Sequence, residues 1–229
     1  MCSDFYFLKL SLFVRNIIDL VKDLFFIFSL KCIAILLTPK VFFNPLSMDQ
    51  SRYHPRNKLL EFFEEEGSYT TVRPSECLLN IGEKCDKVFL ILSGGFVCQN
   101  YNPMVDRLRT INFHLELFHP IMTVIQSFFS DSISNCQLKA VMRSDVLVLQ
   151  KGVILNALKE DDSLHKAYVE ETIYALLAIN EFHTKLITLT TKDMYHYLLK
   201  ECPEIVRQIP AKYIAEFMGV TPEWLSRIR

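Results

Sequence analysis

Residues 209–229 read IPAKYIAEFMGVTPEWLSRIR, and this order of residue types predicts two short helices joined by a tight turn. The first helix is expected over Ala211–Met218, whose apolar residues follow helical spacing on one face. Gly219 comes where a left-handed residue commonly ends a helix. Thr221 then suits an N-cap, and Pro222 suits the first helical position, where its missing N–H costs nothing. The stretch therefore predicts a helix-turn-helix.

The second helix of this unit has an apolar face and a polar face. Its apolar face consists of Trp224, Leu225 and Ile228, which we expect to be buried. Its polar face consists of Glu223, Ser226, Arg227 and Arg229. Arginine can bind guanine O6 and N7 with two hydrogen bonds, and glutamate can accept one from cytosine N4, so this face suits the major groove of DNA. The alternative is a plain helical hairpin in which Glu223 and Arg227 only pair with each other across one turn.

Further upstream, after Gly152, the apolar residues follow helical spacing, with a short helix expected at Val153–Leu158 and a long one at Leu164–Leu189. The middle of the long helix, Thr172–Ile179 (TIYALLAI), is apolar around its whole circumference. A helix that is covered on one side shows a single apolar stripe. We therefore expect this helix to pack on the preceding domain and on its own copy in a two-fold homodimer. The alternative is a helix that is buried within one chain.

The region before Gly152 contains short apolar segments separated by turn residues, a pattern typical of an antiparallel barrel or sandwich. The expected strands are Tyr69–Val72, Cys77–Ile81, Val88–Leu92, Phe96–Tyr101, Leu108–Leu117 and Leu138–Leu149. Helical spacing predicts a helix at Asn57–Glu66, and a short one between Pro120 and Phe129.

The first 46 residues differ from the rest of the chain. They hold 8 of the 18 Phe residues and neither Gly nor Glu. Leu24–Phe43 is about long enough to cross a bilayer, although Lys31 lies near its middle. A reading frame that truly starts at Met48 is our first interpretation, a membrane anchor the second and a secretion signal the third. The remaining residues carry 20 basic and 23 acidic side chains, which is typical of a soluble protein, and we expect a cytoplasmic location.

The seven cysteines and the formal net charge of −1 exclude several classes of protein. An odd number of cysteines without a CxxC pair argues against a disulfide framework, and we expect reduced thiols and no metal site. HExxH, P-loop and Ser/His/Asp patterns are missing from the sequence, so an enzyme is not expected.

Two segments resemble the Crp/Fnr family of bacterial transcription regulators. Residues 78–83 (LLNIGE) and 88–94 (VFLILSG) match the first hairpin of the family's β-roll. Residues 214–229 (IAEFMGVTPEWLSRIR) are very similar to its recognition unit, in the form found in Bacteroidetes members. The resemblance covers roughly Pro55 to the C-terminus. It implies an α+β fold with an antiparallel, jelly-roll-like β-roll sensor domain, a long dimerisation helix and a C-terminal helix-turn-helix domain.

The resemblance also implies domain boundaries and partners. The expected parts are a hydrophobic leader (1–47), a cyclic nucleotide-binding-like β-roll (48–160), the dimerisation helix (161–190) and the DNA-binding domain (191–229). The implied partners are double-stranded DNA, a second copy bound through residues 164–189, RNA polymerase and a small-molecule effector of unknown identity. Glu223 and Arg227 fall on the family's base-contacting positions, and Thr221 falls on a phosphate-contacting position.

Two departures from the family pattern bear on function. Members that respond to cyclic nucleotides carry a Gly-Glu pair and then an Arg that precedes a small hydroxyl residue. Backbone N–H groups and the guanidinium hold the cyclic phosphate, and the carboxylate holds the ribose hydroxyl. The corresponding stretch, about His114–Ala140, contains neither Gly nor Arg, so we do not expect a cyclic nucleotide cofactor. His114 and His119 lie in this ligand region, where haem ligation is an alternative to a structural role.

The second departure is that the chain ends after barely two turns of the recognition helix, at Arg229. A degenerate or truncated member without DNA binding is therefore one alternative function. A membrane-anchored ligand sensor is the other.

Overall fold

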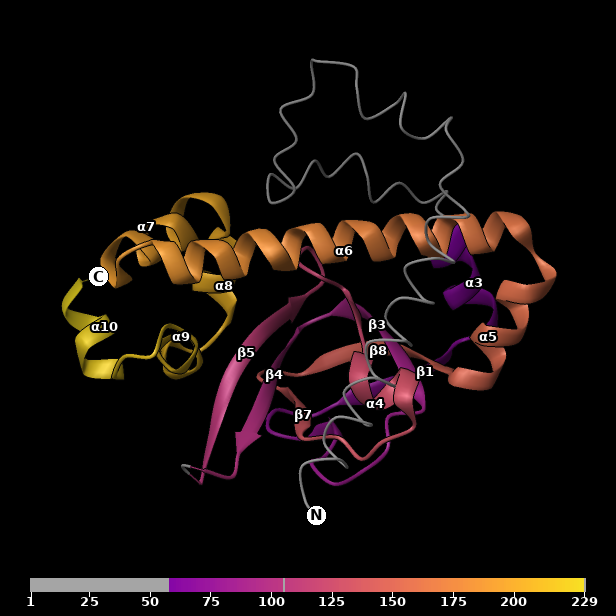
Figure 1. The fold of residues 1–229 in the computed structure, drawn as a ribbon, viewed down its shortest axis with the longest axis horizontal. Coiled ribbons are helices and arrows are strands. Elements are labelled where there is room, and N and C mark those ends of the chain that lie inside the picture. Colours follow the sequence, from indigo (N-terminus) through magenta and orange to yellow (C-terminus); the bar gives the residue numbers. More distant parts are fainter. Residues whose placement is uncertain (1–57, 105, 229) are drawn as a thin grey trace, which may run out of the picture. The chain divides into compact units, whose positions relative to one another are not determined.

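The computed structural model describes residues 58–104 and 106–228, and the alternating segments in the first part of this range form two antiparallel four-stranded sheets (Figure 1). One sheet has the order β1 (Ser68–Val72), β8 (Ser144–Gln150), β3 (Lys87–Ser93) and β6 (Ile121–Met122). The other has the order β2 (Cys77–Leu79), β7 (Cys136–Ala140), β4 (Gly95–Asn102) and β5 (Arg107–Leu115). The predicted antiparallel β-roll is confirmed.

A first hydrophobic core fills the space between the two sheets. Phe89 from β3 and Phe96 from β4 are 2% and 0% exposed, and Leu138 from β7 is 0% exposed. The helix α3 (Lys58–Glu66) adds Leu59 and Phe63 to this core. Strand β7 alternates between buried and half-buried side chains, whereas four consecutive residues of β3, Val88–Ile91, all belong to this core.

The expectation of one continuous strand over Leu138–Leu149 is wrong, because two strands in different sheets occupy this range. The chain turns at residues 141–143 without a Gly or Pro. Ser144 stabilises this turn, because its hydroxyl donates to the Met142 carbonyl (3.0 Å) and accepts from the Gly95 N–H (3.0 Å). Gly94 makes room for that hydroxyl: a Cβ there would lie 2.3 Å from Ser144 Oγ.

The remaining helices follow the sequence pattern closely. The short helix expected between Pro120 and Phe129 is α4 (Ile125–Ser130), which ends one residue later than expected and is preceded by the two-residue strand β6. After α5 (Lys151–Glu160) comes the 27-residue helix α6 (Asp162–Thr188). Asp161 begins α6, because its carboxylate accepts hydrogen bonds from the backbone N–H groups of the first turn and pairs with Lys58 of α3 (2.6 Å).

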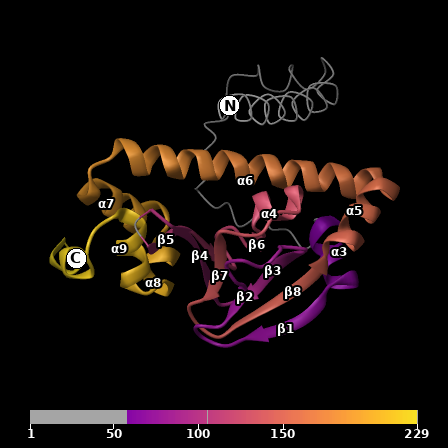
Figure 2. The ribbon, with the colours of Figure 1, turned by 60° about the horizontal axis from the view of Figure 1, so that its bottom comes forward.

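Four helices complete the described chain: α7 (Thr191–Glu201), α8 (Pro203–Gln208), α9 (Ala211–Met218) and α10 (Pro222–Ile228). Figure 2 shows α7, α8 and α9 beside β5 and the end of α6. A second hydrophobic core joins these elements. The ring of Phe217 from α9 lies 5.0 Å from the ring of Phe113 on β5 and 5.0 Å from that of Phe182 on α6.

The predictions for the N-terminal segment, including the Met48 start and the apolar range Leu24–Phe43, fall outside the described residues. Within the described ranges, none of the helices is both long and apolar enough to cross a membrane.

Candidate nucleic-acid interface

The turn between α9 and α10 has the geometry that the sequence predicts. Gly219 adopts a left-handed conformation with φ of 72°. The N–H of Val220 donates to the Ala215 carbonyl (3.0 Å), and the N–H of Gly219 donates to the Glu216 carbonyl (3.2 Å). These two bonds form a Schellman motif, which satisfies the last carbonyls of α9 and sets the direction of the chain into α10.

Helix α10 is capped at its start and anchored on one side. The hydroxyl of Thr221 accepts a hydrogen bond from the Trp224 N–H (3.2 Å), as an N-cap does. Leu225 is 0% exposed and belongs to the second core, against which Ile228 packs. Trp224 and Ile228 are only half-buried, which corrects the expectation that the whole apolar face is buried. In this seven-residue helix, the second core fully covers Leu225 alone.

The opposite side of α10 is open to solvent. Glu223, Ser226 and Arg227 are all exposed, and Arg229 lies outside the described residues. The pKa of Glu223 is held below its ordinary value by hydrogen bonds from its own backbone N–H and from the Thr221 hydroxyl, and to a smaller extent by the charge of Arg227. Glu223 is therefore an ionised hydrogen-bond acceptor at neutral pH, next to a guanidinium that only donates. The structure thus brings Thr221, Glu223 and Arg227 together on one surface.

Helix α9 is held on the β-roll by residues to which the sequence pattern assigned no role. A carboxylate oxygen of Glu216 accepts from the hydroxyl of Thr110 on β5 (2.7 Å) and from the amide of Gln99 on β4 (2.9 Å). Nε of Arg109 donates to the Glu216 carbonyl (3.2 Å). The sequence around Gln99 and Thr110 gives no signal for this contact, because polar residues such as Asn100 and Arg109 stand directly beside them.

Helix α6 leaves much of its apolar surface uncovered. Its fully buried residues are Leu164, Ala178 and Phe182. By contrast, Leu176 is 65% exposed and Ile187 is 82% exposed. The alternative of a helix that is buried within one chain is therefore wrong for the middle of α6.

Residues 114–140, expected from the resemblance to correspond to a phosphate-binding segment, fold here as the end of β5, β6, α4 and β7. Nδ1 of His114 donates to the His119 carbonyl (2.9 Å), and burial lowers the pKa of His114 to about 4. Burial, together with the nearby His114, lowers the pKa of His119 to about 3. Both histidines are therefore neutral at pH 7 and close a turn. Because the segment supplies neither a guanidinium nor a glycine, its residues do not fit a cyclic nucleotide phosphate.

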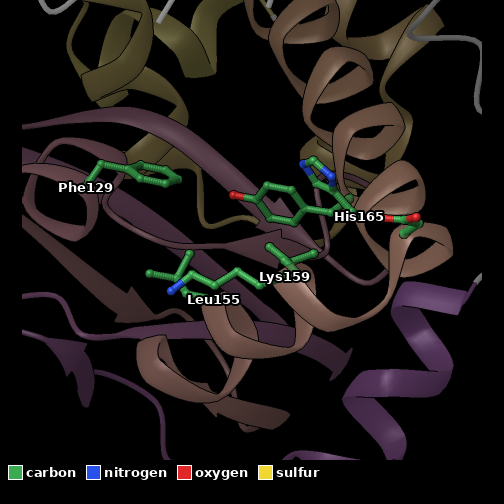
Figure 3. Close-up of a pocket in the computed structure, with 7 residues that line it drawn as sticks. Phe129, Leu155, Lys159 and His165 are labelled. Carbon is green, nitrogen blue, oxygen red and sulfur yellow. The ribbon is translucent and has the colours of Figure 1, made fainter. Parts of the chain in front are cut away.

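A cavity of about 570 Å³ lies between α4, α5 and α6. In Figure 3, Phe129 of α4 and His165 of α6 lie on opposite sides of it, and Leu155 and Lys159 of α5 lie between them. Its lining combines apolar side chains with the amine of Lys159, the imidazole of His165 and the carboxylate of Asp162.

The sequence matches neither a protein-family model nor a curated protein. Solved structures do match. FixK2 from Bradyrhizobium japonicum superposes with a TM-score of 0.55 at 16% identity, over 71% of this chain and 82% of that chain. A putative regulator of the crp/fnr family from Eubacterium rectale superposes with a TM-score of 0.55 at 13% identity, over 78% and 83%. The chain has the Crp/Fnr fold.

A third Crp/Fnr-like structure is CLP of Xanthomonas campestris, a global regulator described as responsive to c-di-GMP. It superposes with a TM-score of 0.54 at 16% identity, over 74% of this chain and 88% of that chain. These neighbours are transcription regulators and not enzymes. In the Crp/Fnr fold of this chain, the two sheets form the β-roll, α6 is the long helix and α9–α10 is the helix-turn-helix.

Proposed function

We propose that this protein is a dimeric, sequence-specific DNA-binding transcription regulator in which the β-roll controls the helix-turn-helix. The observation that supports this most strongly is the construction of α10. Buried Leu225 anchors the helix, and Glu223 and Arg227 point away from the core directly after a capped start. In helix-turn-helix proteins, the N-terminal residues of the second helix contact base edges in the major groove.

Each residue on this surface has a role that matches its chemistry. Arg227 binds guanine O6 and N7 with two hydrogen bonds, and Glu223 accepts from cytosine N4. The Thr221 hydroxyl at the helix entry contacts a backbone phosphate. Ser226 contacts either a base or a phosphate, and Arg229 adds a positive charge at the end of the helix.

The second subunit binds along α6. Val169, Ile173, Leu176 and Asn180 follow the 3–4 spacing of a coiled-coil seam, which continues through His183 to Ile187, and none of these side chains is fully buried. In a parallel pair of helices, Asn180 would face its own copy, and a polar residue at such a position helps to set register and oligomeric state. A two-fold dimer requires a nearly palindromic DNA site whose half-sites lie about one helical turn apart.

We propose that a small-molecule effector other than a cyclic nucleotide controls DNA binding. We also propose that the protein acts in the cytoplasm. The cavity of Figure 3 is the candidate effector site, because its lining residues come from α6 as well as from α4 and α5. To activate transcription, the protein would also have to contact RNA polymerase.

The DNA-binding proposal is tested by selecting preferred sites from a random duplex library and then comparing variants in gel-shift titrations. Arg227→Ala should lower the preference for the selected site over a scrambled site by about 1–3 kcal/mol, because one bidentate base contact is lost. Arg207→Ala removes an equally exposed arginine from α8 and serves as the matched control. Undiminished discrimination by Arg227→Ala would overturn the assignment.

The dimer is tested by sedimentation equilibrium of the full chain. Leu176→Asp places a charge in the proposed seam and should shift the population from dimer to monomer. Leu199→Asp, on α7, alters a side chain that is 45% exposed and lies outside the seam, so it should remain dimeric. A wild-type protein that sediments as a monomer at tens of micromolar would contradict the proposal.

A further inference from the structure

Three polar residues lie side by side across the sheet that faces α9. Gln99 on β4 pairs directly with Gln137 on β7 and with Thr110 on β5. The amide of Gln137 donates to the side-chain oxygen of Gln99 (2.9 Å). The three strands therefore contribute one residue each to a continuous polar row, Gln137–Gln99–Thr110.

This polar row lies in an apolar setting. Gln99 is 4% exposed and Thr110 is 1% exposed. Nearby residues of β4 and β5, such as Val97 and Phe113, belong to the second core. Burying a polar group is unfavourable unless it is hydrogen-bonded, so these positions depend on a partner outside the sheet.

Glu216 of α9 is that partner. One of its carboxylate oxygens accepts from both Gln99 (2.9 Å) and Thr110 (2.7 Å). Hydrogen bonds to an ionised acceptor are about twice as strong as those between neutral groups. Because hydrogen bonds are directional and apolar contact is not, the row fixes where α9 lies along the sheet, whereas the phenylalanines only hold it there.

A second contact reaches the turn itself. The guanidinium of Arg109, next to Thr110 on β5, donates to the Glu216 carbonyl. A Cβ on Gly219 would lie 2.6 Å from a guanidinium nitrogen of Arg109. Near its start, β5 therefore contacts the residue at which the chain turns into α10.

We propose that the Gln137–Gln99–Thr110 row and Glu216 form a positioning contact by which the sensor sheet fixes the orientation of the recognition helix and so the half-site spacing that the dimer accepts. Movement of β4 relative to β5 or β7 disrupts the row, and this links the state of the β-roll to the helix-turn-helix. The part that concerns half-site spacing rests on the proposed function. The part that concerns the orientation of α9 does not.

The contact is tested in the full-length protein with Glu216→Leu, which removes the acceptor, and with Thr110→Val, which replaces a hydroxyl by a methyl group. Hydrogen exchange of the α9 amides should speed up by about tenfold in both variants, while exchange in β1 and β8 stays at the wild-type rate. Glu216→Gln keeps an oxygen acceptor and should restore most of the protection. Glu65→Leu in α3 and Thr184→Val in α6 are the matched controls.

The second readout uses duplexes that carry two selected half-sites at varied separations. Glu216→Leu should accept a wider range of separations and keep the base preference within each half-site. The proposal would be overturned if Glu216→Leu and Thr110→Val both kept the wild-type hydrogen-exchange rates in α9 and the wild-type range of accepted half-site separations. If the wild-type protein selects no DNA site, the proposed function and the spacing claim fail together, and the exchange rates alone decide whether the row positions α9.

Discussion

The two hydrophobic cores of this protein meet at one strand, β4, and use its opposite faces. On β4, Phe96 belongs to the first core inside the β-roll, whereas its neighbour Val97 belongs to the second core with the C-terminal helices. Strand β4 is therefore buried on both faces, whereas β5 contributes only to the second core. A change inside the β-roll that shifts β4 moves part of the surface on which the C-terminal helices pack.

The comparison predicts that each core can be weakened separately. Phe217→Ala removes the ring that contacts both Phe113 and Phe182, and should lower the free energy of unfolding by about 3–5 kcal/mol. Phe96→Ala should have a similar cost in the first core. Hydrogen exchange should show loosening of α7–α10 in the former variant and of β3, β4 and β8 in the latter. Uniform loosening in both would mean that the two cores behave as one.

Acidic pH should lower the stability of the protein through His114, which lies near the C-terminal end of β5. The pKa of His114 lies near 4 in the folded protein because burial disfavours the charged ring, against an ordinary value of 6.5. The unfolded chain therefore binds the proton first, and stability decreases as the pH falls from about 6.5 towards 4, by about 3 kcal/mol in total. Urea unfolding between pH 5 and 7 measures how steeply the free energy of unfolding depends on pH. His119, whose pKa is lowered to about 3, contributes to the same dependence, so His114→Phe should reduce the slope without abolishing it. An unchanged slope would rule out a contribution from His114.

The smallest expected effects on stability come from replacing two glycines, one in the β-roll and one in the helix-turn-helix. Gly82 in the β-roll and Gly219 in the helix-turn-helix both have positive φ, of 87° and 72°. A Cβ at Gly82 meets nothing within 4 Å, whereas one at Gly219 meets Arg109. Each Gly→Ala change should cost about 1–2 kcal/mol of stability for the left-handed backbone. Only Gly219→Ala should also speed hydrogen exchange in α9, since it displaces Arg109.

Local patterns were sufficient to predict most elements of the fold. The alternation in the β-roll, the apolar residues of Ala211–Met218 and the Gly219 turn are properties of neighbouring residues, and all three predictions are confirmed. The turn at residues 141–143 was missed because it depends on Ser144 and Gly94, which are fifty positions apart along the chain.

The docking of α9 on the β-roll could not be predicted either, because it too depends on residues that lie far apart along the chain. Glu216 lies more than a hundred positions from Gln99 and Thr110 along the chain. In the sequence, Glu216 is indistinguishable from an exposed helix residue. The exposed surface of α10 could be predicted, because the N-cap and the helical period alone place Thr221, Glu223, Ser226 and Arg227 on one side of this helix. Their contacts with DNA remain a prediction.

The most direct measurement is a selection of duplex sites by the full-length protein, followed by binding titrations of the selected site and of random DNA at several salt concentrations. We expect a two-fold symmetric site with half-sites about one helical turn apart, bound more tightly than random duplex and progressively weakened by salt. No enriched sequence, together with binding that does not respond to salt, would contradict the assignment of this protein as a DNA-binding regulator.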